Sequence, residues 1–154
     1  MLMEARCGRH GKESTLPIVS KVLDYVEFKL RPRNGCLAVG YCFGGRYAVL
    51  VNAAGRVRCS VVSCPSFLEA EEIAEIQTPT LWLCADTDRT FKEEDKAAAQ
   101  KSLSGKFFES QFVTYPATEH GFCTRFHASK KGSAAASRDA LVRTIGFLKD
   151  AVAD

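Results

Sequence analysis

Apolar residues recur along this chain in two alternating patterns, one typical of amphipathic helices and one typical of buried strands. From Pro17 onward they follow the i, i+4 spacing of a helix, and we expect that helix to stop before Pro32. A short continuous apolar run follows over residues 36–40, as in a strand buried on both faces. A second helix is predicted over residues 44–54, and Gly55 would then take the position just past its end.

The alternation of strand and helix repeats twice more. Ser137 is expected to cap a last helix, in which apolar residues line one face. Strands and helices alternating at this spacing predict an α/β fold of three layers, in which helices cover both faces of an open, mainly parallel sheet of about four strands. The remaining elements are a helix over residues 93–103 and strands over residues 57–63, 80–84 and 112–115.

The organisation is predicted to be simple. Residues 1–15 have no hydrophobic period and are expected to form a loose arm, whereas residues 16–154 form one domain. In open parallel sheets, ligand sites lie at the carboxyl ends of the strands. We therefore look for chemistry in the segments that follow the predicted strands.

Composition restricts the choice of partner and compartment. The 154 residues are 46% hydrophobic and 25% charged, with a formal net charge of +3 and no run of five like charges, so neither nucleic acid nor an anionic membrane is an expected partner. The longest apolar runs fall far short of the roughly 18 residues that cross a bilayer. The seven cysteines are an odd number spread through predicted core segments, and no apolar secretory segment stands near the start. A cytoplasmic protein with reduced thiols is therefore expected.

A candidate nucleophile lies between the first predicted strand and the helix after it, in Gly40-Tyr41-Cys42-Phe43-Gly44-Gly45. A glycine two residues before and another two residues after Cys42 suit a sharp strand-to-helix turn, because side chains there would clash with backbone. At the tip of such a turn the thiol is exposed, and the helix amides lower its pKa. The backbone N–H of Phe43 would point toward a developing oxyanion. A small buried hydrophobe at a strand end is the alternative role for this cysteine.

An acid and a base follow in the order that hydrolases with this turn require, each in a segment after a later strand. Asp86 and Asp88 follow the strand over residues 80–84, and His120 follows the strand over residues 112–115. The spacing alone does not separate the two aspartates.

A metal site is the rival use of these side chains. His120, Cys123 and His127 have ligand-like spacing, and the pair Cys59 and Cys64 could in principle complete a tetrahedral site. The two ends of one predicted strand are too far apart to converge easily, so we expect no metal.

Four motifs stand out along the chain: Gly-Tyr-Cys-Phe-Gly-Gly at 40–45, Cys-Pro-Ser at 64–66, Ala-Asp-Thr-Asp-Arg-Thr-Phe at 85–91 and His-Gly-Phe at 120–122. They resemble those of the dienelactone hydrolases, in the α/β-hydrolase superfamily. Their order and spacing match over roughly residues 16–154. The resemblance implies a Cys-His-Asp triad of Cys42, His120 and Asp88 that hydrolyses small esters or lactones through a thioester, without a metal or organic cofactor. Asp88 is preferred to Asp86 because it matches the family motif.

Two further expectations come from this resemblance. Similar sequences often carry an arginine at the position of Arg125 that could receive a substrate carboxylate through paired N–H groups, although a solvated loop arginine is the alternative. In the family, several strands and a helix precede the helix that here begins near Pro17, and a loop among them supplies the second oxyanion N–H. We therefore expect a weak esterase with half an oxyanion hole, and a strand over residues 36–40 with an unpaired edge open to self-association.

A non-catalytic or redox-sensitive α/β module is the alternative function. The exposed, low-pKa thiol expected at Cys42 would serve a sensor as well as a nucleophile.

Overall fold

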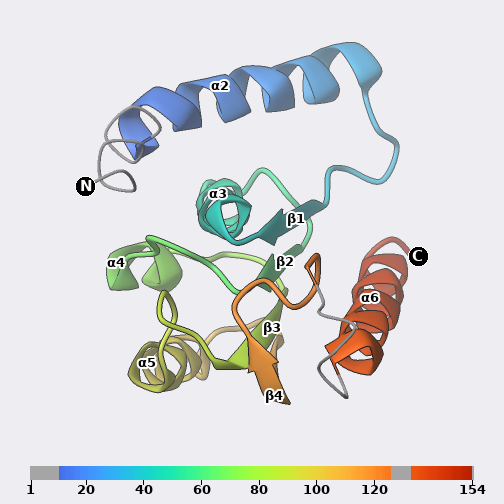
Figure 1. The fold of residues 1–154 in the computed structure, drawn as a ribbon. Helices are drawn as coiled ribbons and strands as arrows, with labels where there is room; N and C mark the ends of the chain where they lie inside the picture. Colours follow the sequence, from blue (N-terminus) through green and yellow to red (C-terminus); the bar gives the residue numbers. More distant parts are fainter. Residues whose placement is uncertain (1–10, 126–132, 154) are drawn as a thin grey trace. The chain divides into compact units, whose positions relative to one another are not determined.

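The structure is a computed structural model that describes residues 11–125 and 133–153 (Figure 1). The chain divides into two compact units, Met1–Cys36 and Leu37–Asp154. The smaller unit contains helical segments, whereas the larger unit contains the sheet and all the candidate site residues that the structure describes.

The described part of the smaller unit contains helix α2 (Lys12–Tyr25), which continues into a turn of π-helix, η1 (Val26–Leu30). Helix α2 begins before Pro17, so the expected start is wrong and part of the segment expected to be a loose arm is helical. Proline favours the first turn because it lacks a backbone N–H and its ring crowds the preceding turn, yet α2 accommodates Pro17 in its interior. The helical path ends at Arg31, whose φ of 50° is left-handed, directly before Pro32 as predicted.

The larger unit is built on one four-stranded sheet in which every neighbouring pair of strands is parallel. Strand order follows chain order, so each connection crosses over between neighbouring strands. This arrangement confirms the predicted α/β fold and its parallel sheet. The strands are β1 (Ala38–Tyr41), β2 (Ser60–Ser63), β3 (Thr80–Thr87) and β4 (Ser110–Glu119).

Helices cover both faces of the sheet, which gives the three layers that the pattern predicted (Figure 1). Three of them, α3, α4 and α5, lie on one face, and α6 lies on the other. Their bounds are α3 (Phe43–Ala53), α4 (Ala70–Ala74), α5 (Glu93–Leu103) and α6 (Ser133–Asp150).

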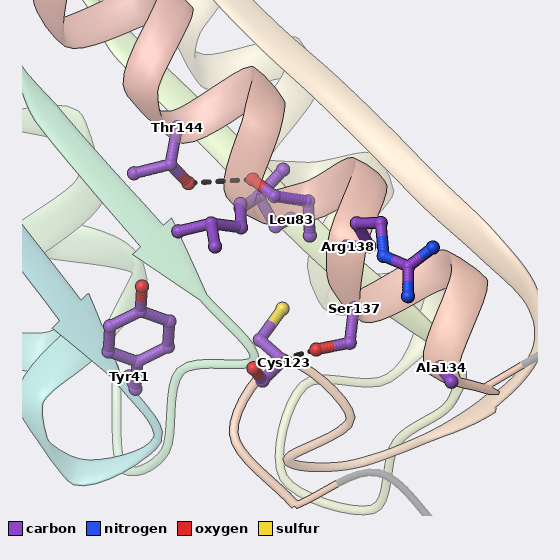
Figure 2. Close-up of a pocket in the computed structure, with 9 residues that line it drawn as sticks. Tyr41, Leu83, Cys123, Ala134, Ser137, Arg138 and Thr144 are labelled. Carbon is purple, nitrogen blue, oxygen red and sulfur yellow. Dashed lines mark hydrogen bonds between the residues drawn. The ribbon is translucent and has the colours of Figure 1, made fainter.

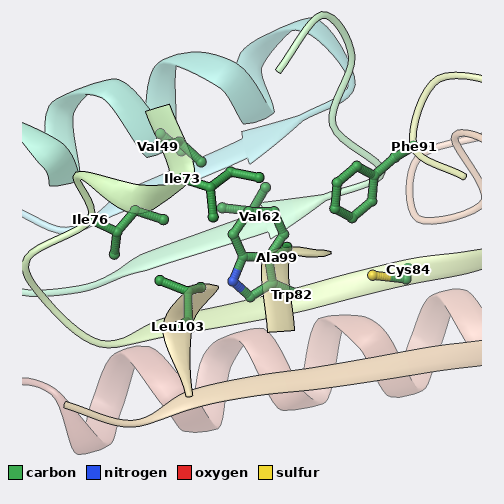
Figure 3. Close-up of a cluster of buried hydrophobic side chains, with 10 residues drawn as sticks. Val49, Val62, Ile73, Ile76, Trp82, Cys84, Phe91, Ala99 and Leu103 are labelled. Carbon is green, nitrogen blue, oxygen red and sulfur yellow. The ribbon is translucent and has the colours of Figure 1, made fainter. Parts of the chain in front are cut away.

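Two hydrophobic clusters fill the spaces between these layers, because successive residues of a strand point to opposite faces. Val62 and Trp82 belong to the cluster under α3 and α5, whereas Val61 and Leu81 belong to the cluster under α6. Trp82 is fully buried at the centre of the first cluster, shown in Figure 3. Its ring stacks on Phe91 and Phe112 with centroids 5.6 and 5.2 Å apart.

The ends of several elements differ from the sequence prediction. Helix α6 begins at Ser133, so Ser137 lies inside it rather than capping it, and the Ser137 hydroxyl donates to the Cys123 carbonyl at 3.1 Å. The sequence did not indicate α4, since five residues are too few to show a helical period. Gly55, with a φ of 68°, follows the end of α3 as predicted.

One buried amide connects α3 to the sheet. The Asn52 side chain, on α3, has no exposed surface, and its Nδ2 donates to the Ser60 hydroxyl of β2 at 2.9 Å. Its Oδ1 accepts from the backbone N–H groups of Gln77 and Thr78 at 3.1 and 3.0 Å. A buried polar group of this kind fixes its neighbours because leaving it unpaired is costly.

Strand β1 lies at one end of the sheet and pairs only with β2 among the described strands. Its side chains Val39 and Tyr41 are 41% and 36% exposed. The expected edge strand is therefore present in the larger unit, with apolar side chains that the described residues leave partly uncovered.

Candidate active site

The turn between β1 and α3 holds Cys42 in a strained conformation. Cys42 has a φ of 51° and a ψ of −116°, a region that residues other than glycine rarely occupy and that costs on the order of 1–3 kcal/mol. Three backbone hydrogen bonds hold it there: Cys42 N–H donates to the Ser63 carbonyl at 2.9 Å, and the Cys42 carbonyl accepts from Gly45 at 3.0 Å and from Ser66 at 3.1 Å. The chain therefore reverses direction sharply at the candidate nucleophile, as the motif predicted.

The glycines around this turn do not contribute equally. A Cβ on Gly40 would lie 2.2 Å from the Gly44 carbonyl oxygen, and a Cβ on Gly45 would lie 3.0 Å from Pro65. A Cβ on Gly44 would meet nothing within 4 Å. The expectation that Gly44 is sterically required is therefore wrong, and the crowded glycine after the cysteine is Gly45.

The structure brings together the three side chains that the family motifs indicated. Cys42 lies between β1 and α3, Asp88 follows β3 directly, and His120 follows β4 directly. His120 Nε2 lies 3.0 Å from Cys42 Sγ, and His120 Nδ1 lies 2.9 Å from Asp88 Oδ2. All three occupy the carboxyl ends of parallel strands, which meet at one edge of a sheet.

The two candidate aspartates are separated only by the tertiary structure. The Asp88 side chain is 1% exposed, contacts His120 and accepts the backbone N–H of Thr90 at 2.8 Å. Asp86 is exposed, and its carboxylate accepts the backbone N–H of Ala117 at 3.1 Å. Asp88 is thus the carboxylate that contacts the imidazole.

Two hydroxyl groups extend this network, and sequence analysis did not assign a role to either. Ser66 Oγ, which is buried, lies 3.4 Å from Cys42 Sγ and 3.3 Å from Thr90 Oγ1. Thr90 Oγ1 donates to Asp88 Oδ1 at 2.8 Å and lies 3.0 Å from His120 Nδ1. The Cys-Pro-Ser and Asp-Arg-Thr motifs that contain these residues were the available signal.

The electrostatics favour charge separation between the cysteine and the histidine. Burial raises the pKa of Cys42, but hydrogen bonds from Ser66 and His120 outweigh it, so the pKa lies below the ordinary value. The hydrogen bond that His120 donates to Asp88 raises the pKa of His120 from 6.5 to about 9, against the effect of burial. Burial also opposes ionisation of Asp88, yet hydrogen bonds from His120 and Thr90 hold its pKa below the ordinary value. The shifts of the Cys42 and His120 pKa values are thus both in the direction that stabilises a thiolate beside an imidazolium.

Phe43 begins α3, and its backbone N–H belongs to the first helical turn, where amides have no partner within the helix. This amide also lies within hydrogen-bonding reach of Cys42, where it lowers the pKa of the thiol. The position is the one expected for an oxyanion donor. The Phe43 ring packs on Tyr47 with centroids 5.0 Å apart.

A cavity of about 330 Å³ lies beside the histidine and is lined in part by Glu119, His120, Phe122 and Arg125. The Arg125 guanidinium lies close to Gly121: a Cβ built on that glycine would lie 2.9 Å from Nη2 of Arg125. Arg125, which is exposed, therefore lies near the imidazole, where it can meet a ligand.

A second cavity of about 330 Å³ lies between β1, β3 and α6, and its lining includes Tyr41, Leu83, Cys123 and Ser137 (Figure 2). The three side chains of the candidate site do not line it.

The rival metal site is not assembled in the part of the chain that the structure describes. Within residues 11–125 and 133–153, no group of three or more His, Cys, Asp or Glu side chains could hold a metal ion. His127, one of the proposed ligands, lies outside the described residues.

None of the described helices combines the length and the apolar character needed to cross a membrane.

Comparison with curated proteins finds two fungal relatives. The chain is 30% identical over 124 residues to "Hydrolase pyvD" of Aspergillus violaceofuscus, a match that covers 79% of this chain and 49% of that protein. It is 28% identical over 141 residues to "Hydrolase tropI" of Talaromyces stipitatus, covering 92% of this chain and 55% of that protein. The chain thus spans about half the length of these relatives.

Solved structures show the same fold at low sequence identity. A putative dienelactone hydrolase from Klebsiella pneumoniae matches with a TM-score of 0.70 and 17% identity, over 83% of this chain and 57% of that one. An acylaminoacyl peptidase from Pyrococcus horikoshii matches with a TM-score of 0.65 and 9% identity, over 85% of this chain and 26% of that one. The family model for dienelactone hydrolases matches residues 4–152, which begins within the segment expected as an arm. The chain therefore belongs to the dienelactone hydrolase family and has the fold of the α/β-hydrolase superfamily.

Proposed function

We propose that this chain hydrolyses small esters or lactones, with Cys42 as the nucleophile, His120 as the acid and base, and Asp88 as the group that orients the histidine. The observation that carries the proposal is the continuous contact from Cys42 Sγ to His120 Nε2 at 3.0 Å and from His120 Nδ1 to Asp88 Oδ2 at 2.9 Å. This is the order of contacts that a nucleophile, a base and an orienting carboxylate require.

The first half of the reaction forms a thioester. The Cys42 thiolate attacks the substrate carbonyl carbon, a C–S bond forms, and the carbonyl oxygen becomes an oxyanion that the Phe43 N–H stabilises. When this intermediate collapses, the C–O bond of the ester breaks and the leaving alkoxide takes the proton from Nε2 of His120. For a lactone, the released alcohol stays attached to the acyl group.

The second half needs only water. Neutral His120 removes a proton from water, the hydroxide adds to the thioester carbonyl, and the thiolate leaves as the carboxylic acid forms. Asp88 holds the imidazole with Nδ1–H directed away from the sulfur, so that Nε2 can exchange the proton in both halves. The proposed reaction steps use no metal or organic cofactor.

Arg125 supports a preference for acidic substrates. Its guanidinium lies near His120 at the cavity of about 330 Å³, and a guanidinium binds a carboxylate through two parallel hydrogen bonds.

The test is a screen of small activated esters, lactones and thioesters, with Cys42→Ala as the blank. We expect the parent to hydrolyse some of them, and we expect mass spectrometry of the quenched reaction to find the acyl group on Cys42. Hydrolysis by Cys42→Ala at the parent rate would refute the assignment. Circular dichroism of both proteins checks that the substitution leaves the fold intact.

The alternative function is that of a non-catalytic α/β module with a reactive Cys42 thiol. It is favoured by one observation, the lowered pKa of the partly exposed Cys42, which makes a thiolate reactive toward oxidants as well as esters. The two functions differ in the fate of the acylated cysteine. A sensor would accumulate acylated Cys42 after one stoichiometric burst, whereas a hydrolase continues at a steady rate.

A further inference from the structure

A buried serine contacts the reacting sulfur in addition to His120. Ser66, 2% exposed, lies in the segment after β2, and its Oγ lies 3.4 Å from Cys42 Sγ. Its backbone N–H donates to the Cys42 carbonyl at 3.1 Å, so the strained turn holds both the backbone and the side chain of this residue.

The hydroxyl has one hydrogen and two neighbours that can accept it. Besides Cys42 Sγ, it lies 3.3 Å from Thr90 Oγ1. Thr90 directs its own hydroxyl hydrogen to Asp88 Oδ1 at 2.8 Å, which leaves the Thr90 oxygen able to accept. The choice between the two acceptors depends on the charge of the sulfur, because hydrogen bonds to charged groups are roughly twice as strong as those between neutral groups.

We propose that Ser66 is a further catalytic residue: its hydroxyl donates to the Cys42 thiolate before attack and turns to Thr90 Oγ1 once the sulfur is acylated. The proposal rests on the function proposed for the triad. While the sulfur is anionic it is the better acceptor, and when it becomes part of a neutral thioester it accepts weakly. The hydroxyl turns back as the thiolate leaves during deacylation. No atom is transferred from Ser66 at any step.

The same movement links the nucleophile to the far end of the triad. When Ser66 donates to Thr90, the threonine hydroxyl becomes a stronger donor to Asp88, since hydrogen bonds in a chain polarise one another. The buried serine would therefore stabilise the thiolate directly, and support the orienting carboxylate through Thr90.

The test follows the reaction of Cys42 with iodoacetamide as a function of pH, a readout that does not require turnover. Cleavage after Arg33 and Arg46 yields one peptide that carries both Cys36 and Cys42. All proteins are therefore made in a Cys36→Ser background, and labelling of that peptide reports Cys42 alone.

For Ser66→Ala we expect the apparent pKa of Cys42 to rise by about one unit, and alkylation below that pKa to slow about tenfold, which corresponds to about 1.4 kcal/mol. Ser66→Thr keeps the hydroxyl and should restore the parent profile. Ser60→Ala is the matched control, because it also removes a buried hydroxyl of this region, one that bonds Asn52 instead of Cys42. It should lower stability without moving the alkylation profile.

A parent-like alkylation profile for a folded Ser66→Ala protein would overturn the proposal, as would an equal shift in Ser60→Ala. If Ser66→Ala does not fold, Ser66→Val, which has the shape of the Ser66→Thr side chain without its hydroxyl, must shift the profile in the same direction. The hydrolase function fails separately, through ester hydrolysis that survives Cys42→Ala, so the two failures are distinguishable.

Discussion

Gly40 and Gly44 stand two residues before and two residues after Cys42, yet the structure predicts opposite outcomes for alanine at the two positions. A Cβ on Gly40 would lie 2.2 Å from the oxygen and 2.6 Å from the carbon of the Gly44 carbonyl, in the first turn of α3. To relieve that overlap, the start of α3 must move by about 1 Å, because the opposing atoms are backbone and cannot rotate away. At Gly44 an added Cβ meets nothing within 4 Å.

The expected magnitudes follow from this difference. Overpacking costs about 1–3 kcal/mol where side chains can adjust, so we expect Gly40→Ala to lower the free energy of unfolding by about 3 kcal/mol. A shift of about 1 Å at the nucleophile should also slow ester turnover about a hundredfold. For Gly44→Ala we expect stability between that of the parent and about 1 kcal/mol above it, since alanine favours helix over glycine by up to that amount.

Urea unfolding followed by circular dichroism measures the first quantity, and ester turnover with iodoacetamide labelling of Cys42 measures the second. The two variants control for each other, since both add one methyl group to a glycine near the thiol. A Gly40→Ala protein with the urea midpoint and the Cys42 reactivity of the parent would refute the steric crowding that we infer at Gly40. A Gly44→Ala protein as unstable as Gly40→Ala would refute the difference between the two glycines.

Three further predictions concern the triad, the core and the sheet edge. In Asp88→Asn, the pKa of His120 should fall from about 9 toward 6.5, because Asp88 raises it in the parent. The alkaline limb of ester turnover should then move to lower pH and alkylation of Cys42 at neutral pH should slow, and an unchanged pH profile would contradict this. Asn52→Ala leaves buried partners unpaired and should lower the free energy of unfolding by about 2–4 kcal/mol in urea titrations. The β1 edge should support self-association, so Val39→Lys should lower the mass measured by light scattering, and equal masses would exclude that edge.

The hydrophobic pattern alone determined most of the fold. Continuous apolar runs bounded by turn residues predicted four strands, and the structure contains all four in one parallel sheet. The helix predicted over residues 93–103 has the bounds observed for α5. These features are local consequences of periodicity and propensity, so they can be seen in a single sequence. The motif around Cys42 likewise predicted a sharp turn, because glycine spacing reports the space available to the backbone.

The tertiary structure decided what periodicity cannot show. Asp86 and Asp88 both follow the same strand, and only the path of the chain after β4 determines which carboxylate meets His120. Which glycine after Cys42 is crowded depends on Pro65, from a segment that the turn's own sequence does not include. The Ser66 hydroxyl reaches the sulfur for the same reason, since residues 24 positions apart in the chain meet where β1 and β2 end side by side. Side-chain contacts between parallel strands are set by register and packing, and these emerge only when the whole sheet forms.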